Sequence, residues 1–195
     1  MTPSPPLQRF ARDQLPVMPW KNGGGSTREI ACWPPGAGLD DFGWRISIAS
    51  IAAPGLFSVF AGVDRHILLL DGGGVRLQSP DGAIDHRLDT PGQPFAFSGD
   101  AAVHCTLLGG ASTDFNVMAR RGQWQAELHV LEQAGAIAPA PHGLLLALGG
   151  AWRLGHDRSV LHTGEGLRWS GAMQPVDVQP ESPGARLLAV RLHSP

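Results

Sequence analysis

The sequence predicts an all-β protein, and three features indicate this class: frequent turn residues, short apolar runs between them, and an internal repeat. The 195 residues include 26 glycines and 17 prolines, which interrupt the chain too often for long helices. Short strands separated by regular turns are typical of a sandwich or barrel. The expected strands are Trp44–Ile51, Leu56–Phe60, His66–Leu70, Phe95–Phe97, Ala102–Leu108, Phe115–Met118, Leu144–Leu148 and Leu187–Leu192.

Helix is expected to be a minor component. Gln123–Ala134 is the one segment with a plausible helical pattern. The same residues also fit a strand that opens a second half of the chain, and the pattern leaves both alternatives open.

The internal repeat predicts that one structural unit is used twice. Leu69–Leu77 aligns without gaps to Leu146–Leu154, and five of the nine positions are identical. Phe97–Gly99 is echoed by Trp169–Gly171, and an apolar strand follows each echo, Val103–Leu108 in one half and Leu187–Leu192 in the other. Two matches in the same order indicate duplication. We expect a first half at about 16–122 and a second half at about 123–193, within a single domain that spans 1–195.

Composition excludes several classes of function. The hydrophobic fraction of 43% and the charged fraction of 16% are those of a globular chain. The formal net charge is −2 and there is no run of basic residues, so neither nucleic acid nor a membrane is an expected partner. No segment is long and apolar enough to span a bilayer, and a cytoplasmic location is expected. Cys32 and Cys105 are expected to be free thiols.

Metal and cofactor chemistry is not expected. The eight histidines form no H-x-H pair, which is the spacing that places two ligands on one strand face. The chain also lacks a G-x-S-x-G nucleophile motif. We therefore predict a protein without metal, cofactor or nucleophilic catalytic residue.

Three strands each carry a pair of polar residues on one face, because alternate residues of a strand share a face. In Trp44–Ile51, Arg45 and Ser47 lie on the opposite face of the strand from Trp44. If the pairs point into a barrel, they form a pocket with donors and acceptors; if they point outward, they are solvated faces. The three pairs are Thr27 with Glu29, Arg45 with Ser47, and Asp114 with Asn116.

Two cationic residues are candidates for binding a carboxylate. The guanidinium of Arg45 can donate two parallel hydrogen bonds. Lys21 is the single lysine beside 14 arginines, and it lies with Asn22 before three glycines whose N–H groups can converge on an anion. A flexible turn is the alternative for this segment. We expect neighbouring Asp64 and Arg65 to form a structural ion pair.

Five strings in order resemble the HutD/Ves family: PWKNGGGSTREI at 19–30, FGWRISIASI at 42–51, GLFSVFAGVDRHILLLDGGG at 55–74, FAFSGD at 95–100 and TDFNVMARRG at 113–122. This resemblance implies a bicupin fold, with two cupin-like β-barrel halves in one compact unit. It also implies a link to histidine utilisation, in which family members are thought to bind a small metabolite and moderate the pathway.

The resemblance favours a pocket over solvated faces, and the expected function is binding of a small anionic carboxylate metabolite without catalysis. A rival is a metal-independent acid–base enzyme, an isomerase or hydrolase, with Glu29 or Asp114 as base. A homodimer that pairs through the edge of Leu187–Leu192 is a third possibility. The predicted ligand-binding residues are Lys21, Asn22, Thr27, Glu29, Trp44, Arg45, Ser47, Phe60, Asp114 and Asn116.

Overall fold

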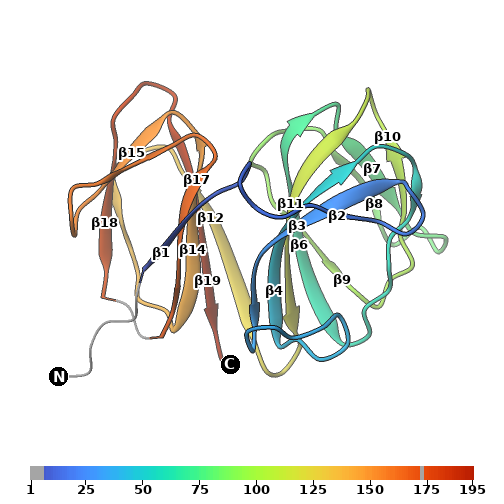
Figure 1. The fold of residues 1–195 in the computed structure, drawn as a ribbon. Helices are drawn as coiled ribbons and strands as arrows, with labels where there is room; N and C mark the ends of the chain where they lie inside the picture. Colours follow the sequence, from blue (N-terminus) through green and yellow to red (C-terminus); the bar gives the residue numbers. More distant parts are fainter. Residues whose placement is uncertain (1–6, 172–173) are drawn as a thin grey trace. The chain divides into compact units, whose positions relative to one another are not determined.

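The structure is all-β. The computed structural model describes residues 7–171 and 174–195, which form nineteen strands and no helix (Figure 1). Within these residues no helix is therefore long and apolar enough to cross a membrane. The segment with two alternatives, Gln123–Ala134, contains strand β12 (Gln125–Leu131).

The contacts within the chain divide it into two compact units. The first half is Pro16–Trp124, and the second half is Gln125–Pro195 together with the segment that ends at Leu15. This N-terminal segment reaches the second half through β1 (Gln8–Ala11), which pairs with β17 (Glu165–Ser170). The sequence contains no pattern that assigns this strand to the distant half.

The first half consists of two antiparallel sheets. The six-stranded sheet has the order β2 (Met18–Pro19), β3 (Gly25–Trp33), β4 (Trp44–Ile51), β11 (Ser112–Arg120), β6 (Val63–Gly72) and β9 (Phe95–Ser98). The four-stranded sheet has the order β5 (Gly55–Leu56), β10 (His104–Leu107), β7 (Val75–Gln78) and β8 (Asp85–Leu88).

The second half also consists of two antiparallel sheets. The five-stranded sheet has the order β1, β17, β14 (His142–Gly149), β19 (Arg186–His193) and β12. The four-stranded sheet has the order β13 (Gly135–Ile137), β18 (Val176–Pro180), β15 (Ala151–Leu154) and β16 (Val160–His162).

The two halves repeat one topology. Strands β4 to β11 pair as β4-β11-β6-β9 and β5-β10-β7-β8, and strands β12 to β19 pair as β12-β19-β14-β17 and β13-β18-β15-β16. Each of the eight strands β4 to β11 therefore has a counterpart eight strands later in the second half, whereas β2 and β3 have none. One predicted equivalence was wrong: Leu187–Leu192 lies in β19, whose counterpart is β11, whereas the strand at Val103–Leu108 is β10, whose counterpart is β18.

Two predicted strands behave differently from expectation. Of Leu56–Phe60, only Leu56 belongs to a strand, because the chain leaves β5 there and continues as an irregular segment to Gly62. Leu187–Leu192 is not an edge, because β19 is paired with β14 on one side and with β12 on the other. Edge pairing between two copies through this strand is therefore not possible.

One face of the six-stranded sheet is turned toward the four-stranded sheet, and we call it the inner face. Ile51, Ile67, Leu69 and Phe97 on this face form a single buried cluster with residues of the facing sheet, namely Val75, Leu77, Leu88 and Cys105. The His86 ring on β8 also stacks on the Phe95 ring on β9, with centroids 3.8 Å apart. The first half is thus a cupin-like sandwich with an apolar centre.

Candidate functional site

Buried polar side chains gather on the inner face of the first half. Among the described residues, seven polar or charged residues are buried, and six of them belong to strands β4, β6 and β11. Each of the six lies in step with the inner-face residues, two, four or six positions along its own strand or opposite one on the neighbouring strand, so all six point toward the facing sheet. They are Arg45, Ser47, Arg65, Ser112, Asp114 and Asn116.

Strand register arranges these residues in rows across the sheet. The residues of a row are cross-strand partners on neighbouring strands. One row consists of Cys32, Arg45, Met118, Arg65 and Phe97. The next row consists of Glu29, Ser47, Asn116, Ile67 and Phe95. Arg45 and Arg65 are therefore two strand spacings apart, about 10 Å between their backbones, which long side chains on one face can span.

Arg65 is a buried guanidinium without a carboxylate partner among the described residues. Its side chain donates to Asn116 Oδ1 at 3.2 Å and to the Ser58 carbonyl at 3.5 Å, while Nε has no partner. Burial, with a contribution from the positive charge of Arg45, lowers the pKa of Arg65 to about 10. Two buried positive charges on one face repel each other, so an anion between them is strongly favoured.

Three phenylalanine rings surround the Arg65 guanidinium. Its carbon lies 4.9 Å from the ring centroid of Phe97, 5.2 Å from that of Phe57 and 5.8 Å from that of Phe60. Cation–π contacts of this kind attract a guanidinium and hold its plane in place. Phe57 and Phe60 come from the irregular segment after β5, so this segment covers the arginine.

Arg45 is paired, but only through one nitrogen. Its Nε donates to Glu29 Oε2 at 2.7 Å, and the Arg45 side chain is 10% exposed while that of Glu29 is 32% exposed. No other hydrogen bond to Arg45 is formed by the described residues, so both Nη nitrogens are available to a ligand. Arg45, Arg65 and Glu29 together carry a net charge of +1.

A β-bulge brings Cys32 to this group. Alternation predicts Cys32 on the opposite face from Glu29, but the register between β3 and β4 shifts between Glu29 and Ala31, which places Cys32 opposite Arg45. Burial, and then the Glu29 carboxylate, raise the pKa of the Cys32 thiol. The prediction of two free thiols agrees with the structure.

Asp114 lies one row deeper on β11, opposite Ala49 and Leu69. It is fully buried, accepts a 2.8 Å hydrogen bond from Ser112 Oγ, and leaves Oδ2 without a partner. Burial raises the pKa of Asp114 to about 6, against the opposing effect of the Ser112 hydrogen bond. In turn, burial and the nearby Asp114 raise the pKa of Cys105 to about 12.

Lys21 and Asn22 lie in an exposed turn and do not meet Arg45. Gly23 N–H donates to the Trp20 carbonyl and Gly24 N–H donates to Asn22 Oδ1, so these glycine donors are already used within the turn. Gly25, where the turn joins β3, pairs with Ile51 at the far end of β4 from Arg45. Six strand residues, about 20 Å, therefore separate the turn from Arg45, too far for one small carboxylate to bind both.

The other predicted residues are distributed as follows. Thr27 is on the inner face, where its Oγ1 accepts a 2.8 Å hydrogen bond from Trp20 Nε1. Phe60 lies against Arg65, as described above. Trp44 is buried on the opposite face of β4 from Arg45, so it does not line the same site.

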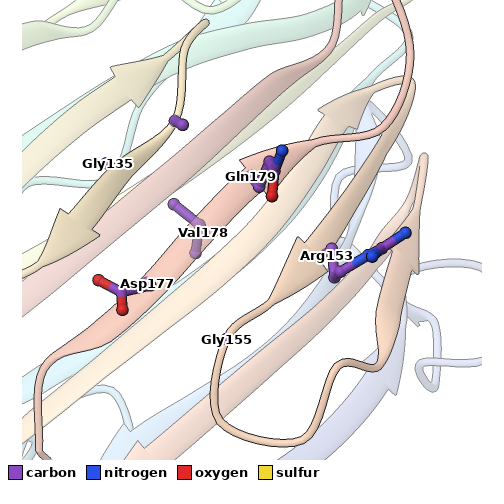
Figure 2. A pocket seen from close by; sticks show the side chains of 7 residues that line it. Gly135, Arg153, Gly155, Asp177, Val178 and Gln179 are labelled. Atoms are coloured by element: carbon purple, nitrogen blue, oxygen red, sulfur yellow. The ribbon is translucent and has the colours of Figure 1, made fainter.

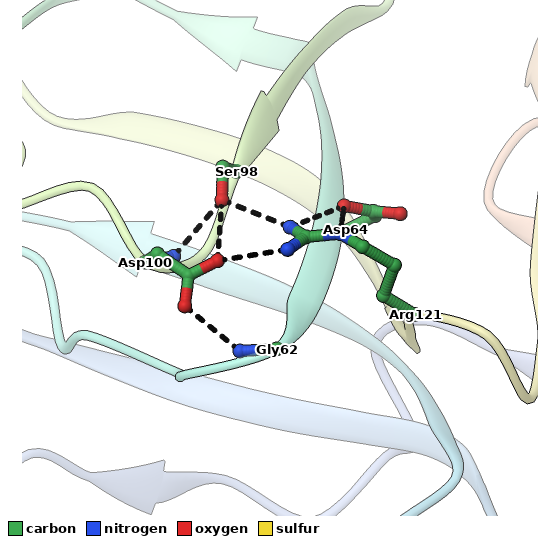
Figure 3. Close-up of polar contacts among 5 residues, drawn as sticks. All are labelled: Gly62, Asp64, Ser98, Asp100 and Arg121. Atoms are coloured by element: carbon green, nitrogen blue, oxygen red, sulfur yellow. Dashed lines mark hydrogen bonds and ion pairs between the residues drawn. The ribbon is translucent and has the colours of Figure 1, made fainter.

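An exposed ion-pair cluster fixes the end of the sheet that carries Arg65 and Phe97 (Figure 3). Arg121 reaches Asp64 at 2.7 Å and Asp100 at 3.1 Å, and Asp100 also accepts from Gly62 N–H and from Ser98 Oγ. Asp64 and Ser98 are the sequence neighbours of Arg65 and Phe97. The predicted ion pair between Asp64 and Arg65 was wrong, because the two side chains leave the strand on opposite faces.

The inner face of the second half carries an apolar cluster and a paired arginine in place of an unpaired one. Gly143 pairs with Trp169 as Arg65 pairs with Phe97, so Gly143 occupies the position of Arg65. A Cβ on Gly143 would lie 2.1 Å from the Trp169 ring, which shows that the indole takes the space of the arginine side chain. On the neighbouring strands Arg191 is bonded to Glu127, so its charge is balanced.

A surface hollow of about 360 Å³ lies in the second half, between β13, β15 and β18 (Figure 2). Its polar lining side chains, Arg153, Asp177 and Gln179, are carried on strands whose intervening residues, Trp152, Leu154 and Val178, point into the core. Arg153 is ion-paired with Glu181 at 2.6 Å. The hollow therefore contains no buried charge in need of a partner, and the inner face of the first half is the stronger candidate site.

The described residues do not form a metal site. No group of three or more His, Cys, Asp or Glu side chains among them is arranged to hold a metal ion. The inner face of the first half instead has guanidinium and amide groups, which repel or bind cations poorly.

Six residues of the site were missed in the sequence, namely Trp20, Cys32, Phe57, Arg65, Phe97 and Ser112. Arg65 was detectable, because Val63, Arg65, Ile67 and Leu69 share one face of a strand, and an arginine in such a row is an inner-face residue. The contacts of Phe57, Phe97 and Trp20 depend on tertiary structure, and no local pattern predicts them.

Comparison with known proteins identifies the family. The HutD family model matches residues 12–186. Protein Ves from Citrobacter koseri is 42% identical over 164 residues, covering 84% of this chain and 83% of that protein. The structure of HutD from Pseudomonas fluorescens SBW25 in a formate condition is 32% identical with a TM-score of 0.82, covering 97% of this chain and 100% of that one.

A more distant likeness supports the fold alone. The cupin 2 conserved barrel domain protein from Leptotrichia buccalis has a TM-score of 0.60 at 11% identity, covering 94% of this chain and 95% of that one. The fold of this chain is therefore similar to that of a cupin barrel protein. On the family model and the identity to Protein Ves, the chain belongs to the HutD family.

Proposed function

We propose that the first half binds a small anionic metabolite through a carboxylate held between Arg45 and Arg65. The observation that carries this proposal is the charge imbalance of the inner face. Arg65 is 7% exposed and has no carboxylate partner among the described residues. A buried arginine without a carboxylate partner lowers the stability of the folded protein unless a bound anion pairs with it.

The hydrogen-bond donors of the site suit a carboxylate. Arg45 offers two Nη nitrogens and Arg65 offers Nε, all planar N–H donors that suit two-oxygen recognition. The Asn116 Oδ1 accepts a hydrogen bond from the Arg65 guanidinium, and three phenylalanine rings surround this guanidinium. The proposed anion site therefore pairs Arg45 with Arg65 and not with the expected Lys21.

We further propose that the protein is an accessory or regulatory factor of histidine utilisation that binds without catalysis, in the cytoplasm and without nucleic acid or membrane as a partner. Membership of the HutD family supports the link to this pathway. Among the described residues, the charged side chains Arg191 and Glu127 on the inner face of the second half are paired with each other, which supports a single site in the first half.

An acid–base enzyme is the second candidate, and Asp114 is the observation that favours it. A carboxyl with a pKa of about 6 is suited to proton transfer near neutral pH. However, Asp114 Oδ2 is enclosed, and one oxygen of Glu29 is held by Arg45. Turnover of a pathway acid that is lost in Asp114→Asn and kept in Arg87→Met would favour catalysis over binding alone.

The test is ligand-induced stabilisation of the full chain. Histidine, urocanate, formylglutamate, formiminoglutamate and glutamate are compared with unrelated metabolites by thermal shift, and hits are measured by calorimetry. A ligand at 100 times its Kd adds about 2.7 kcal/mol. Arg65→Met and Arg45→Met should abolish the shift, whereas Arg87→Met, which removes an exposed arginine of the same half, should retain it. Equal shifts in all three variants would refute the site.

A further inference from the structure

The Glu29 carboxylate indicates what else the ligand carries. Glu29 Oε2 accepts a hydrogen bond from Arg45 Nε, and the Cys32 thiol interacts with the Glu29 carboxylate; the described residues form no other hydrogen bond to Glu29. The side chain of Glu29 is 32% exposed, in contrast to 10% for that of Arg45. Glu29 therefore presents an accepting oxygen at the accessible side of the paired arginines.

The Glu29 carboxylate in this position weakens the binding of a ligand that offers only a carboxylate. Through Arg45, the Glu29 oxygens lie within a few ångströms of the position that a ligand carboxylate takes on the Arg45 Nη nitrogens. Two like charges at this separation repel each other. A ligand that brings an N–H donor beside its own carboxylate instead forms a charge-assisted hydrogen bond with Glu29.

We propose that the site selects small carboxylic acids that carry an N–H donor close to the carboxylate. Glu29 accepts a hydrogen bond from this donor. This inference rests on the proposed anion site and adds its ligand class. Arg45 and Arg65 bind the carboxylate, and Glu29 accepts from the nitrogen. Acids with an amide, imine or ammonium N–H at the α-carbon are the class that this chemistry recognises.

The experiment uses a matched pair of probes on the full chain. N-acetylglycine and acetoxyacetate have the same size and carboxylate, and they differ in an N–H in place of an ester oxygen. Calorimetry should show N-acetylglycine binding about tenfold or more tightly than acetoxyacetate, because a hydrogen bond to a charged group is worth about a factor of ten or more. Equal affinities for the two probes would overturn the inference.

The Glu29→Gln variant should change the affinities for the two probes in opposite directions, which distinguishes a role in recognition from structural damage. Removing the carboxylate charge should weaken N-acetylglycine binding and strengthen acetoxyacetate binding, and loss of folding cannot produce both changes. Asp85→Asn is the control, since Asp85 is also a carboxylate paired with an arginine in the first half, at 2.7 Å from Arg76, and it should change neither affinity. If Glu29→Gln changes both affinities in the same direction, Glu29 does not recognise the N–H donor of the ligand.

The outcomes also distinguish this inference from the proposed function. If wild-type protein binds neither probe, and none of the pathway acids stabilises it, the anion site itself is refuted. If it binds both probes equally and Arg65→Met abolishes binding of both, the anion site stands and the Glu29 inference fails.

Discussion

Replacing Asp114 by asparagine should stabilise the protein at neutral pH and not at acid pH. The side chain is fully buried and one oxygen has no hydrogen-bonding partner. Its ionised form is therefore poorly solvated in the folded state, while the unfolded chain solvates it fully. Asparagine keeps an oxygen for the Ser112 hydroxyl and removes the charge.

The expected magnitude follows from the shift of the pKa. Burial raises the pKa of Asp114 from its ordinary value of 3.8 to about 6. A rise of this size corresponds to about 3 kcal/mol of differential stability, at 1.36 kcal/mol for each pKa unit. For a carboxyl whose folded pKa is raised, the penalty is absent below pH 3.8, develops between pH 3.8 and 6, and is complete above pH 6.

The assay is urea denaturation of wild type and Asp114→Asn at intervals from pH 4 to pH 8. The stability advantage of the variant should grow across this range and level off above pH 6. Asp81→Asn is a matched control, because Asp81 also accepts from a serine two residues earlier but is exposed, and this hydrogen bond lowers its pKa. An advantage of Asp114→Asn that stays constant from pH 4 to pH 8 would refute the assignment of a buried, destabilised carboxylate.

Two further predictions concern structure around the two inner faces. Gly143→Ala should destabilise the protein by about 1–3 kcal/mol, because the new Cβ meets the Trp169 ring; thermal unfolding should show little change for Gly110→Ala, whose Cβ meets nothing within 4 Å. Asp100→Asn should lower the melting temperature at pH 7, since the Gly62 N–H and then Ser98 and Arg121 lower the pKa of Asp100 to about 2. Its contribution is present above pH 3.8 and is lost as pH falls toward 2, so a difference unchanged at pH 3 contradicts this role.

Much of the fold was predictable because the duplication is local in sequence. The ungapped match of Leu69–Leu77 to Leu146–Leu154 falls on the β6–β7 and β14–β15 turns, which are equivalent in the two halves. What the sequence did not reveal was long-range pairing. Strand β1 joins β17 across more than 150 residues, and an isolated four-residue strand carries no information about its distant partner.

The polar pairs of the candidate site were predictable from the sequence. The burial of these residues and the presence of a second arginine, Arg65, were not predicted. Alternation identified Glu29, Arg45 and Asn116 as side chains on shared faces, because period-two geometry holds along each strand. It failed at Cys32, since a one-residue bulge reverses the face of every residue beyond it. It also failed for Lys21, because proximity to glycines in sequence says nothing about the register that carries the turn away from Arg45.

A purely structural role for Arg65 is difficult to reconcile with its surroundings. Burial and Arg45 lower its pKa to about 10 from 12.5, a free-energy cost of about 3 kcal/mol for keeping the charge. The equivalent position in the second half shows that this fold does not need the charge, because Gly143 and the Trp169 indole fill the same space. A residue that lowers stability in one half, and is dispensable in the other, is best explained by an anion that binds there. By this reasoning Arg65→Met should raise the melting temperature of the ligand-free protein and abolish its response to ligand.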